Sequence, residues 1–142
     1  MTVHEGGCHC GNVRLSYETN IPPAETELRA CQCSFCRKHN SLAAADPSGR
    51  LSIRVKNEDL LSRYGFGLRT AEYLVCRDCG VYVAAVTSNT EEKRAIIVVN
   101  ALDERAQFTR EPLLTVYDAE TRDERIARRH ARWMPVKWSI EH

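Results

Sequence analysis

Short stretches of alternating apolar and polar residues dominate the pattern along the chain. Residues 13–17 and 51–55 alternate completely, and residues 70–75 alternate in part. Alternation with a period of two is typical of a β-strand with one buried face. Residues 81–87 and 95–99 are almost continuously apolar and rich in β-branched side chains, which predicts more deeply buried strands. The pattern therefore predicts a mainly β fold.

One helix is predicted near the end of the chain. Thr121 and Glu124 have the spacing of a capping box, in which each side chain satisfies the backbone amide of the other residue. Pro135 is expected to end this helix. Three residues would share its buried face: Ile126, His130 and Trp133. Five arginines would occupy its solvated surface: Arg122, Arg125, Arg128, Arg129 and Arg132. Residues 119–142 are thus expected to form a C-terminal helical extension.

Length and composition predict a single domain over residues 1–142. A chain of 142 residues that is 43% hydrophobic and 27% charged can bury one core. No stretch approaches the roughly 18 apolar residues that a membrane span requires, so no membrane association is expected. Lysine and arginine number 20 against 19 acidic residues, so the whole molecule has no field that would attract nucleic acid.

The seven cysteines add candidate chemistry to this picture. Their odd number and their frequency argue against a disulfide scaffold, and the first residues carry no export pattern. We therefore expect a cytoplasmic protein whose thiols stay free to bind metal. The cysteines form three clusters: Cys8 with Cys10, Cys31 with Cys33 and Cys36, and Cys76 with Cys79.

Cysteines two or three positions apart can converge on one zinc ion. Four of them would complete a closed structural site: Cys8, Cys10, Cys76 and Cys79. The other three would hold a second zinc with an open fourth position, as in a catalytic site: Cys31, Cys33 and Cys36. Spacing alone leaves this partition open, because the three could share an ion with either pair. A zinc-stabilised domain without chemistry and a set of inert buried thiols are the alternatives.

The order and spacing of these motifs resemble a known family. Residues 6–11 read GGCHCG, residues 31–38 read CQCSFCRK and residues 76–80 read CRDCG. Together they resemble the glutathione-dependent formaldehyde-activating enzyme family, whose domain is shared with centromere protein V. The likeness extends from Gly6 to about Leu102.

The resemblance implies a zinc-stabilised β-tent fold and different roles for two zinc ions, one structural and one catalytic. By matching motif, Cys8, Cys10, Cys76 and Cys79 would hold the structural zinc. Cys31, Cys33 and Cys36 would hold the catalytic one. The implied reaction is that of a carbon-sulfur lyase run in reverse, in which glutathione adds to formaldehyde and gives S-hydroxymethylglutathione. Glutathione would thus be the co-substrate.

Several residues near the clusters carry weaker signals. Arg37 and Lys38 are the candidates for binding the carboxylates of glutathione. His39 could complete the second zinc site or act as an acid or base, although an ordinary surface histidine is the favoured interpretation. His9 lies between two ligands and is expected to be structural or to face solvent. The large aromatic residues are expected to pack rather than to stack on a ligand: Tyr64, Trp133 and Trp138.

A second hypothesis is a non-catalytic zinc module that recognises a protein or a nucleic acid. The segment from Thr121 to Arg132 carries five arginines against two acidic residues, a local positive charge that can contact phosphates. The near-neutral chain argues for weak binding, so nucleic acid is not the expected partner. A small-molecule substrate is expected instead, and exposed sheet edges make a homodimer plausible.

Overall fold

The computed structural model describes residues 1–88 and 90–141; the last residue of the predicted C-terminal extension, His142, lies outside this range. Its strands are β1 (Thr2–Gly7), β2 (Val13–Thr19), β3 (Arg29–Cys31), β4 (Ala43–Ala44), β5 (Arg50–Val55), β6 (Leu61–Tyr64), β7 (Ala71–Cys76), β8 (Tyr82–Thr87), β9 (Arg94–Val98), β10 (Leu113–Thr115) and β11 (Met134–Ile140). Its α-helices are α1 (Ser34–His39) and α2 (Arg122–Arg132). Short 3-10 turns occupy Pro23–Glu25, Glu58–Leu60, Val99–Ala101 and Arg105–Gln107. The predicted mainly β fold is confirmed.

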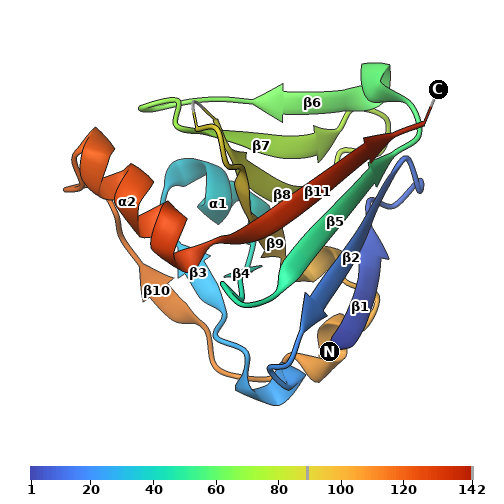
Figure 1. The fold of residues 1–142 in the computed structure, drawn as a ribbon, viewed down its shortest axis with the longest axis horizontal. Coiled ribbons are helices and arrows are strands. Elements are labelled where there is room, and N and C mark those ends of the chain that lie inside the picture. Colours follow the sequence, from blue (N-terminus) through green and yellow to red (C-terminus); the bar gives the residue numbers. More distant parts are fainter. Residues whose placement is uncertain (89, 142) are drawn as a thin grey trace.

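The strands form two connected walls (Figure 1). One wall has the order β1-β2-β5-β11, in which β11 runs parallel to β5 and the other neighbours are antiparallel. In the other wall β9 lies between two branches: β8, β7 and β6 follow on one side, and β4, β3 and β10 on the other. β11 also pairs antiparallel with β9, so it joins the two walls.

The core lies between these walls and follows the predicted strand patterns. On β2 and β5 the inward side chains are fully buried, among them Leu15, Leu51 and Ile53. Burying one such side chain stabilises the fold by about 1.5–3 kcal/mol. β8 is buried along its whole length, as its continuous apolar run predicted. Its second face contributes Tyr82 and Ala85 to a smaller cluster that also contains Trp133.

β11 is one of the elements that the sequence pattern did not predict; the others are β1, β3, β4, β6, β10 and the helix α1. The helix ends at Arg132, and the chain then continues as a strand through Ile140. Pro135 is the second residue of this strand rather than the stop of the helix, and the strand start is a position where proline is tolerated. Residues 134–140 are therefore extended, and the helical part of the C-terminal segment is limited to α2.

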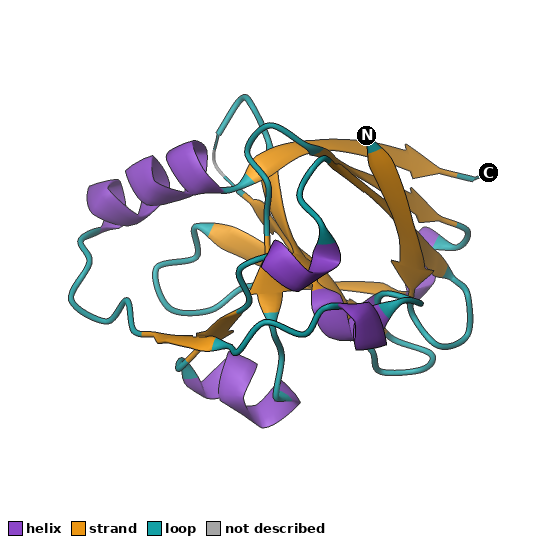
Figure 2. Ribbon diagram, turned by 90° about the horizontal axis from the view of Figure 1, so that it is seen from below, coloured by secondary structure: helices purple, strands orange, loops and turns teal. Residues whose placement is uncertain are grey.

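The predicted capping box at the start of α2 is confirmed. The Thr121 amide donates to Glu124 Oε1 at 3.0 Å, and the Glu124 amide donates to Thr121 Oγ1 at 3.1 Å. Seen from below in Figure 2, α2 lies at one end of the molecule and the C-terminus at the opposite end. No helix in the described part of the chain is both long enough and apolar enough to cross a membrane.

The prediction of which residues of α2 are buried is wrong for His130 and for several arginines. His130, expected on the buried face, is exposed, whereas Arg129 from the expected solvated face is only 5% exposed. Arg125 and Arg128 are also half-buried. The reason is tertiary: the inner face of the helix meets polar partners, including Thr70 and Glu120, that can bind guanidinium groups.

Candidate metal centres and the adjoining cavity

Four cysteines from two distant parts of the chain meet at the first site. Cys8 and Cys10 lie in the turn after β1, Cys76 ends β7, and Cys79 lies in the turn before β8. Their sulfur atoms all lie within 4.8 Å of one another. The Sγ–Sγ distance is 3.7 Å from Cys8 to Cys10 and 3.6 Å from Cys10 to Cys76. A tetrahedral zinc with Zn–S bonds of ~2.3 Å requires sulfurs about 3.8 Å apart, so this group fits the ion.

The backbone around these cysteines supports such a site. The Val13 amide donates to Cys8 Sγ at 3.2 Å, and the Gly80 amide donates to the Cys76 carbonyl at 2.8 Å. Gly11 and Gly80 have φ angles of 87° and 79°, in the left-handed region that glycine adopts without strain. Both turns can therefore curl around a common centre.

Cys79 and Cys10 of this group differ in how readily they ionise. Desolvation opposes ionisation of Cys79, but amide hydrogen bonds from Cys10 and Val81 outweigh it and lower the pKa of Cys79 to about 6. At Cys10 the Asn12 amide favours the thiolate, but desolvation and the neighbouring sulfurs raise its pKa to about 12. A bound metal would supply the charge that lets all four act as thiolates.

The remaining three cysteines meet at a second site. Cys31 ends β3, Cys33 is the N-cap of α1, and Cys36 lies within α1. Their sulfur atoms also lie within 4.8 Å of one another. The Cys36 amide donates to Cys33 Sγ at 3.4 Å. All seven cysteines are free thiols, and they divide into four and three, the grouping that spacing had left open.

The three thiols of this triplet are strongly unequal. A hydrogen bond from the Cys36 thiol, with a smaller contribution from the positive charge of Arg128, lowers the pKa of Cys31 to about 5. The same hydrogen bond and burial raise the pKa of Cys36. The ionised form is therefore favoured at Cys31 and disfavoured at Cys36. Three sulfurs leave the fourth position of a tetrahedral ion open.

Next to the triplet lies a small cavity of about 60 Å³, to which β3, β10 and α2 contribute lining residues. Its lining includes Cys31 and Cys36 from the triplet and an aromatic wall formed by Tyr73, Tyr82 and Trp133. Burial raises the pKa of Tyr73 to about 12, so this wall is uncharged at neutral pH. Three arginines complete the charged part of the lining: Arg29, Arg128 and Arg129.

Two arginines of α2 are fixed by one carboxylate. Arg128 Nε donates to Glu120 Oε2 at 2.7 Å, and Arg125 Nε donates to Glu120 Oε1 at 3.3 Å. The Arg128 guanidinium also stacks 3.6 Å from the centre of the Tyr117 ring. The hydrogen bond from Arg128 is the main reason why the pKa of Glu120 lies below its ordinary value. This network joins α2 to the segment that connects it with β10.

Arg129 is held differently from its neighbours. Its Nη1 donates to Thr70 Oγ1, and its guanidinium lies 4.8 Å from the Trp133 ring centre. The sequence analysis missed these cavity arginines because it assigned the charged positions of α2 to solvent. The four-residue spacing between Arg129 and Trp133 places both on one helical face and was the available signal.

The other predicted site residues lie away from this cavity. Arg37 and Lys38 are exposed on α1, and neither lines the cavity. His39 is exposed and packs on Phe35, with ring centres 4.6 Å apart. His9 is exposed and lies outside the four-sulfur group, as expected.

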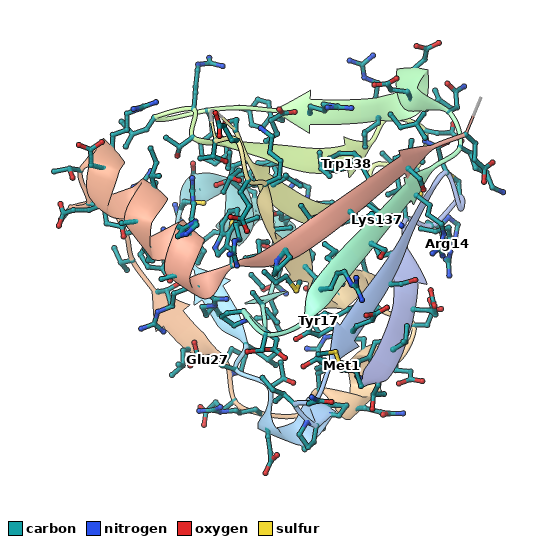
Figure 3. All side chains as sticks on the ribbon, viewed as in Figure 1. Met1, Arg14, Tyr17, Glu27, Lys137 and Trp138 are labelled. Carbon is teal, nitrogen blue, oxygen red and sulfur yellow. The ribbon has the colours of Figure 1, made fainter. Side chains whose placement is uncertain are left out.

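The three aromatic residues pack against protein groups, as expected. Tyr64 stacks on Phe66 with ring centres 5.5 Å apart, and Trp133 is buried. Trp138 lies on β11 (Figure 3), where the Arg63 guanidinium is 4.9 Å from its ring centre.

Comparison with known proteins agrees with this geometry. The chain is similar to a Rhodobacter sphaeroides protein of known crystal structure, with 30% sequence identity and a TM-score of 0.57. That match covers 78% of this chain and 99% of the other. The model of the family described as glutathione-dependent formaldehyde-activating enzyme matches residues 3–119. Because this match spans most of the chain, including all seven cysteines, the protein belongs to the glutathione-dependent formaldehyde-activating enzyme family.

Proposed function

We propose that the protein is a zinc-dependent enzyme of the carbon-sulfur lyase type that joins the thiol of glutathione to formaldehyde. The observation that carries this proposal is the three-sulfur group of Cys31, Cys33 and Cys36, which opens onto a cavity. Membership of the family supplies the substrate class. The free thiols suit a reducing compartment, and we propose the cytoplasm.

The two cysteine groups have different roles in this proposal. Cys8, Cys10, Cys76 and Cys79 hold a structural zinc that ties the N-terminal turn to the β7–β8 turn. Cys31, Cys33 and Cys36 hold the catalytic zinc. When bound there, zinc supplies the Lewis acid that keeps an incoming thiol ionised near neutral pH.

The chain's own residues shape the space in which the addition takes place. The thiol sulfur bonds to the aldehyde carbon while the proton of the thiol ends on the carbonyl oxygen, so the reaction balances without an oxidant or reductant. Tyr73, Tyr82 and Trp133 exclude water from one wall of the cavity. Arg37 and Lys38, exposed on α1, are proposed to contact a carboxylate of glutathione outside the cavity.

Replacing one ligand of the triplet tests the proposal. Cys33→Ser should lower the zinc content from two ions per chain to one, as measured by native mass spectrometry. It should also lower enzyme-dependent formation of S-hydroxymethylglutathione, followed by exchange NMR above the uncatalysed rate, by about a hundredfold or more. Ser34→Ala, at an exposed neighbouring position, is the matched control. Unchanged turnover in Cys33→Ser would remove the triplet from the mechanism.

The alternative of a nucleic-acid-binding module loses its main structural support. Of the five arginines of α2, Arg125, Arg128 and Arg129 are engaged inside the protein. Of these five arginines, only Arg122 and Arg132 are exposed. A helix that directs most of its positive charge inward presents little of it to a phosphate backbone.

A further inference from the structure

We propose that the cavity beside the triplet binds a carboxylate group of the substrate, held between Arg29 of β3 and Arg129 of α2. This inference rests on the proposed function only in taking the triplet as the reaction site. It identifies the substrate as an adduct that carries a negative charge close to the reacting carbon.

Arg129 is a buried cation without a carboxylate partner. The residue is 5% exposed, and its Nε is buried without a hydrogen-bond partner among the described residues. Its one hydrogen bond goes to the neutral hydroxyl of Thr70. Glu120, the nearby acid, is already shared by Arg125 and Arg128. Among the described residues, Arg129 is therefore in contact with a hydroxyl and the face of the Trp133 ring, but it forms no ion pair with a carboxylate.

Arg29 of β3 is a second buried arginine in the lining of the same cavity. It is 9% exposed, and its Nε is also buried without a hydrogen bond in the described structure. The carboxylate nearest to it, Glu27, remains 3.9 Å from this nitrogen, which is too far for a hydrogen bond. Arg29 lies two residues before Cys31 on β3, so both side chains project from the same face of the strand.

A third unpaired group belongs to the neighbouring strand. Thr115 pairs with Cys31 in the β10–β3 register, and its Oγ1 is buried without a partner. Thr115, Arg29 and Arg129 all line the cavity. A hydroxyl and two guanidinium groups can donate to the two oxygens of one carboxylate.

The charges favour an anion over a neutral ligand. Among the described residues that line the cavity there are three arginines and no aspartate or glutamate. A buried charge that lacks a counter-charge destabilises a protein, and a bound carboxylate would remove that cost. The triplet thiolates do not fully serve this purpose, because a bound Zn²⁺ would neutralise two of their three negative charges and leave one beside three arginines. The small volume of about 60 Å³ suits one such group.

α2 also lies outside the part of the chain that the family model matches, which ends at residue 119. The carboxylate pocket is therefore built partly from a segment beyond the matched region. The carboxylate can come from the aldehyde, as in glyoxylate, or from the thiol. In either case the anion anchors the adduct within reach of the triplet.

An NMR titration of the zinc-loaded protein with acetate tests this inference without any turnover. The Trp133 indole N–H reports on the cavity wall, and acetamide is the neutral probe of the same shape. Acetate should shift this signal saturably and acetamide should not. Arg129→Gln should weaken acetate binding about tenfold or more, the loss expected for a charge-assisted hydrogen bond. Arg122→Gln, on the exposed face of α2, should leave it unchanged.

Equal shifts by acetate and acetamide in the wild-type protein would overturn the proposal, and this comparison does not depend on any variant folding. An unchanged acetate affinity in both Arg129→Gln and Arg29→Gln would overturn it as well. Turnover without acetate binding would refute the carboxylate pocket but leave the proposed function intact. Acetate binding without turnover would support the pocket but contradict the proposed function.

Two further reactions distinguish whether the aldehyde or the thiol supplies the carboxylate. If the aldehyde supplies it, glyoxylate should be a better substrate than formaldehyde even with 2-mercaptoethanol as the thiol. If the thiol supplies it, formaldehyde should react well with glutathione and poorly with 2-mercaptoethanol.

Discussion

At the scale of single residues, two cysteines of the four-sulfur group belong to the main hydrophobic core. Cys76 is fully buried and Cys8 is 4% exposed, whereas Cys10 of the same group is exposed. In the triplet, Cys31 is half-buried and Cys36 is buried, and both line the cavity. A zinc in the first site would bind two segments that are 66 residues apart, as Cys10 and Cys76 are. A cysteine-to-serine substitution should therefore affect the stability of the fold differently in the two groups.

Cys76→Ser should destabilise the whole domain, whereas Cys33→Ser should change its stability little. The expected loss in Cys76→Ser is several kcal/mol, because binding of a structural zinc contributes directly to the free energy of folding. Thermal unfolding followed by circular dichroism measures the difference, with Ser34→Ala as the control. A melting temperature of Cys76→Ser equal to that of the wild type would show that the four-sulfur site has no structural role.

At the scale of elements, α2 is positioned by polar contacts rather than by a broad apolar stripe. Its capping box fixes where the helix begins, and Glu120 binds the side chains of Arg125 and Arg128 one and two turns later. Trp133 anchors the other end in the smaller core cluster. The orientation of the helix, and with it the cavity, thus depends on the charge of Glu120.

Glu120→Gln should loosen α2 and lower the free energy of unfolding by about 1 kcal/mol at neutral pH. The pKa of Glu120 is lowered in the folded state, chiefly by the Arg128 hydrogen bond. Its contribution is therefore complete above its unfolded pKa of about 4.3 and is lost as pH falls through the lower folded value.

Urea unfolding from pH 7 to pH 3 checks this expectation. The difference in unfolding free energy between wild type and Glu120→Gln should shrink at the acid end, because protonation makes the two side chains alike. Asp123→Asn, at an exposed position of the same helix, controls for the loss of a charge. A difference that stays constant over this range would contradict the role assigned to the Glu120 carboxylate.

At the scale of the whole molecule, β11 holds the two walls together. It pairs with β5 from Val136 to Ile140 and with β9 through Met134 and Pro135. Met134 is fully buried in the main core. The last strand of the chain therefore completes the fold by pairing with a strand far back in the sequence, since the register partners Leu51 and Val136 are 85 residues apart.

Truncation after Arg132 should abolish cooperative folding of the entire domain rather than remove a dispensable tail. The physical reason is that β5 and β9 would each lose a neighbour and the core would lose Met134. Thermal unfolding and the dispersion of amide signals in NMR measure the effect, with Lys137→Ala, at an exposed position of β11, as the control. A truncated protein with a sharp transition near the wild-type temperature would contradict this role.

Local sequence patterns predicted those features whose interacting residues lie close together in the chain. Alternation predicted β2 and β5, because the period of a strand shows which of its faces is buried. The capping box predicted the start of α2, because its two residues are three positions apart. The cysteine spacing indicated two metal centres, because the ligands of one turn must lie within a few residues of one another.

Only the tertiary structure decided features whose partners are distant in sequence. Arg129 bonds to Thr70, which lies 59 residues earlier, so no local pattern distinguished it from a solvated arginine. β11 has alternating burial, but Pro135 suggested the end of a helix rather than a strand. Its partner strand β5 lies far back in the sequence. The cavity beside Cys31 exists because these long-range contacts bring α2 onto β3 and β10. The sequence by itself thus determined the strands β2, β5, β7, β8 and β9, the start of α2 and the three cysteine clusters. The grouping of these clusters into two sites and the surroundings that would select a substrate depend on how the chain packs.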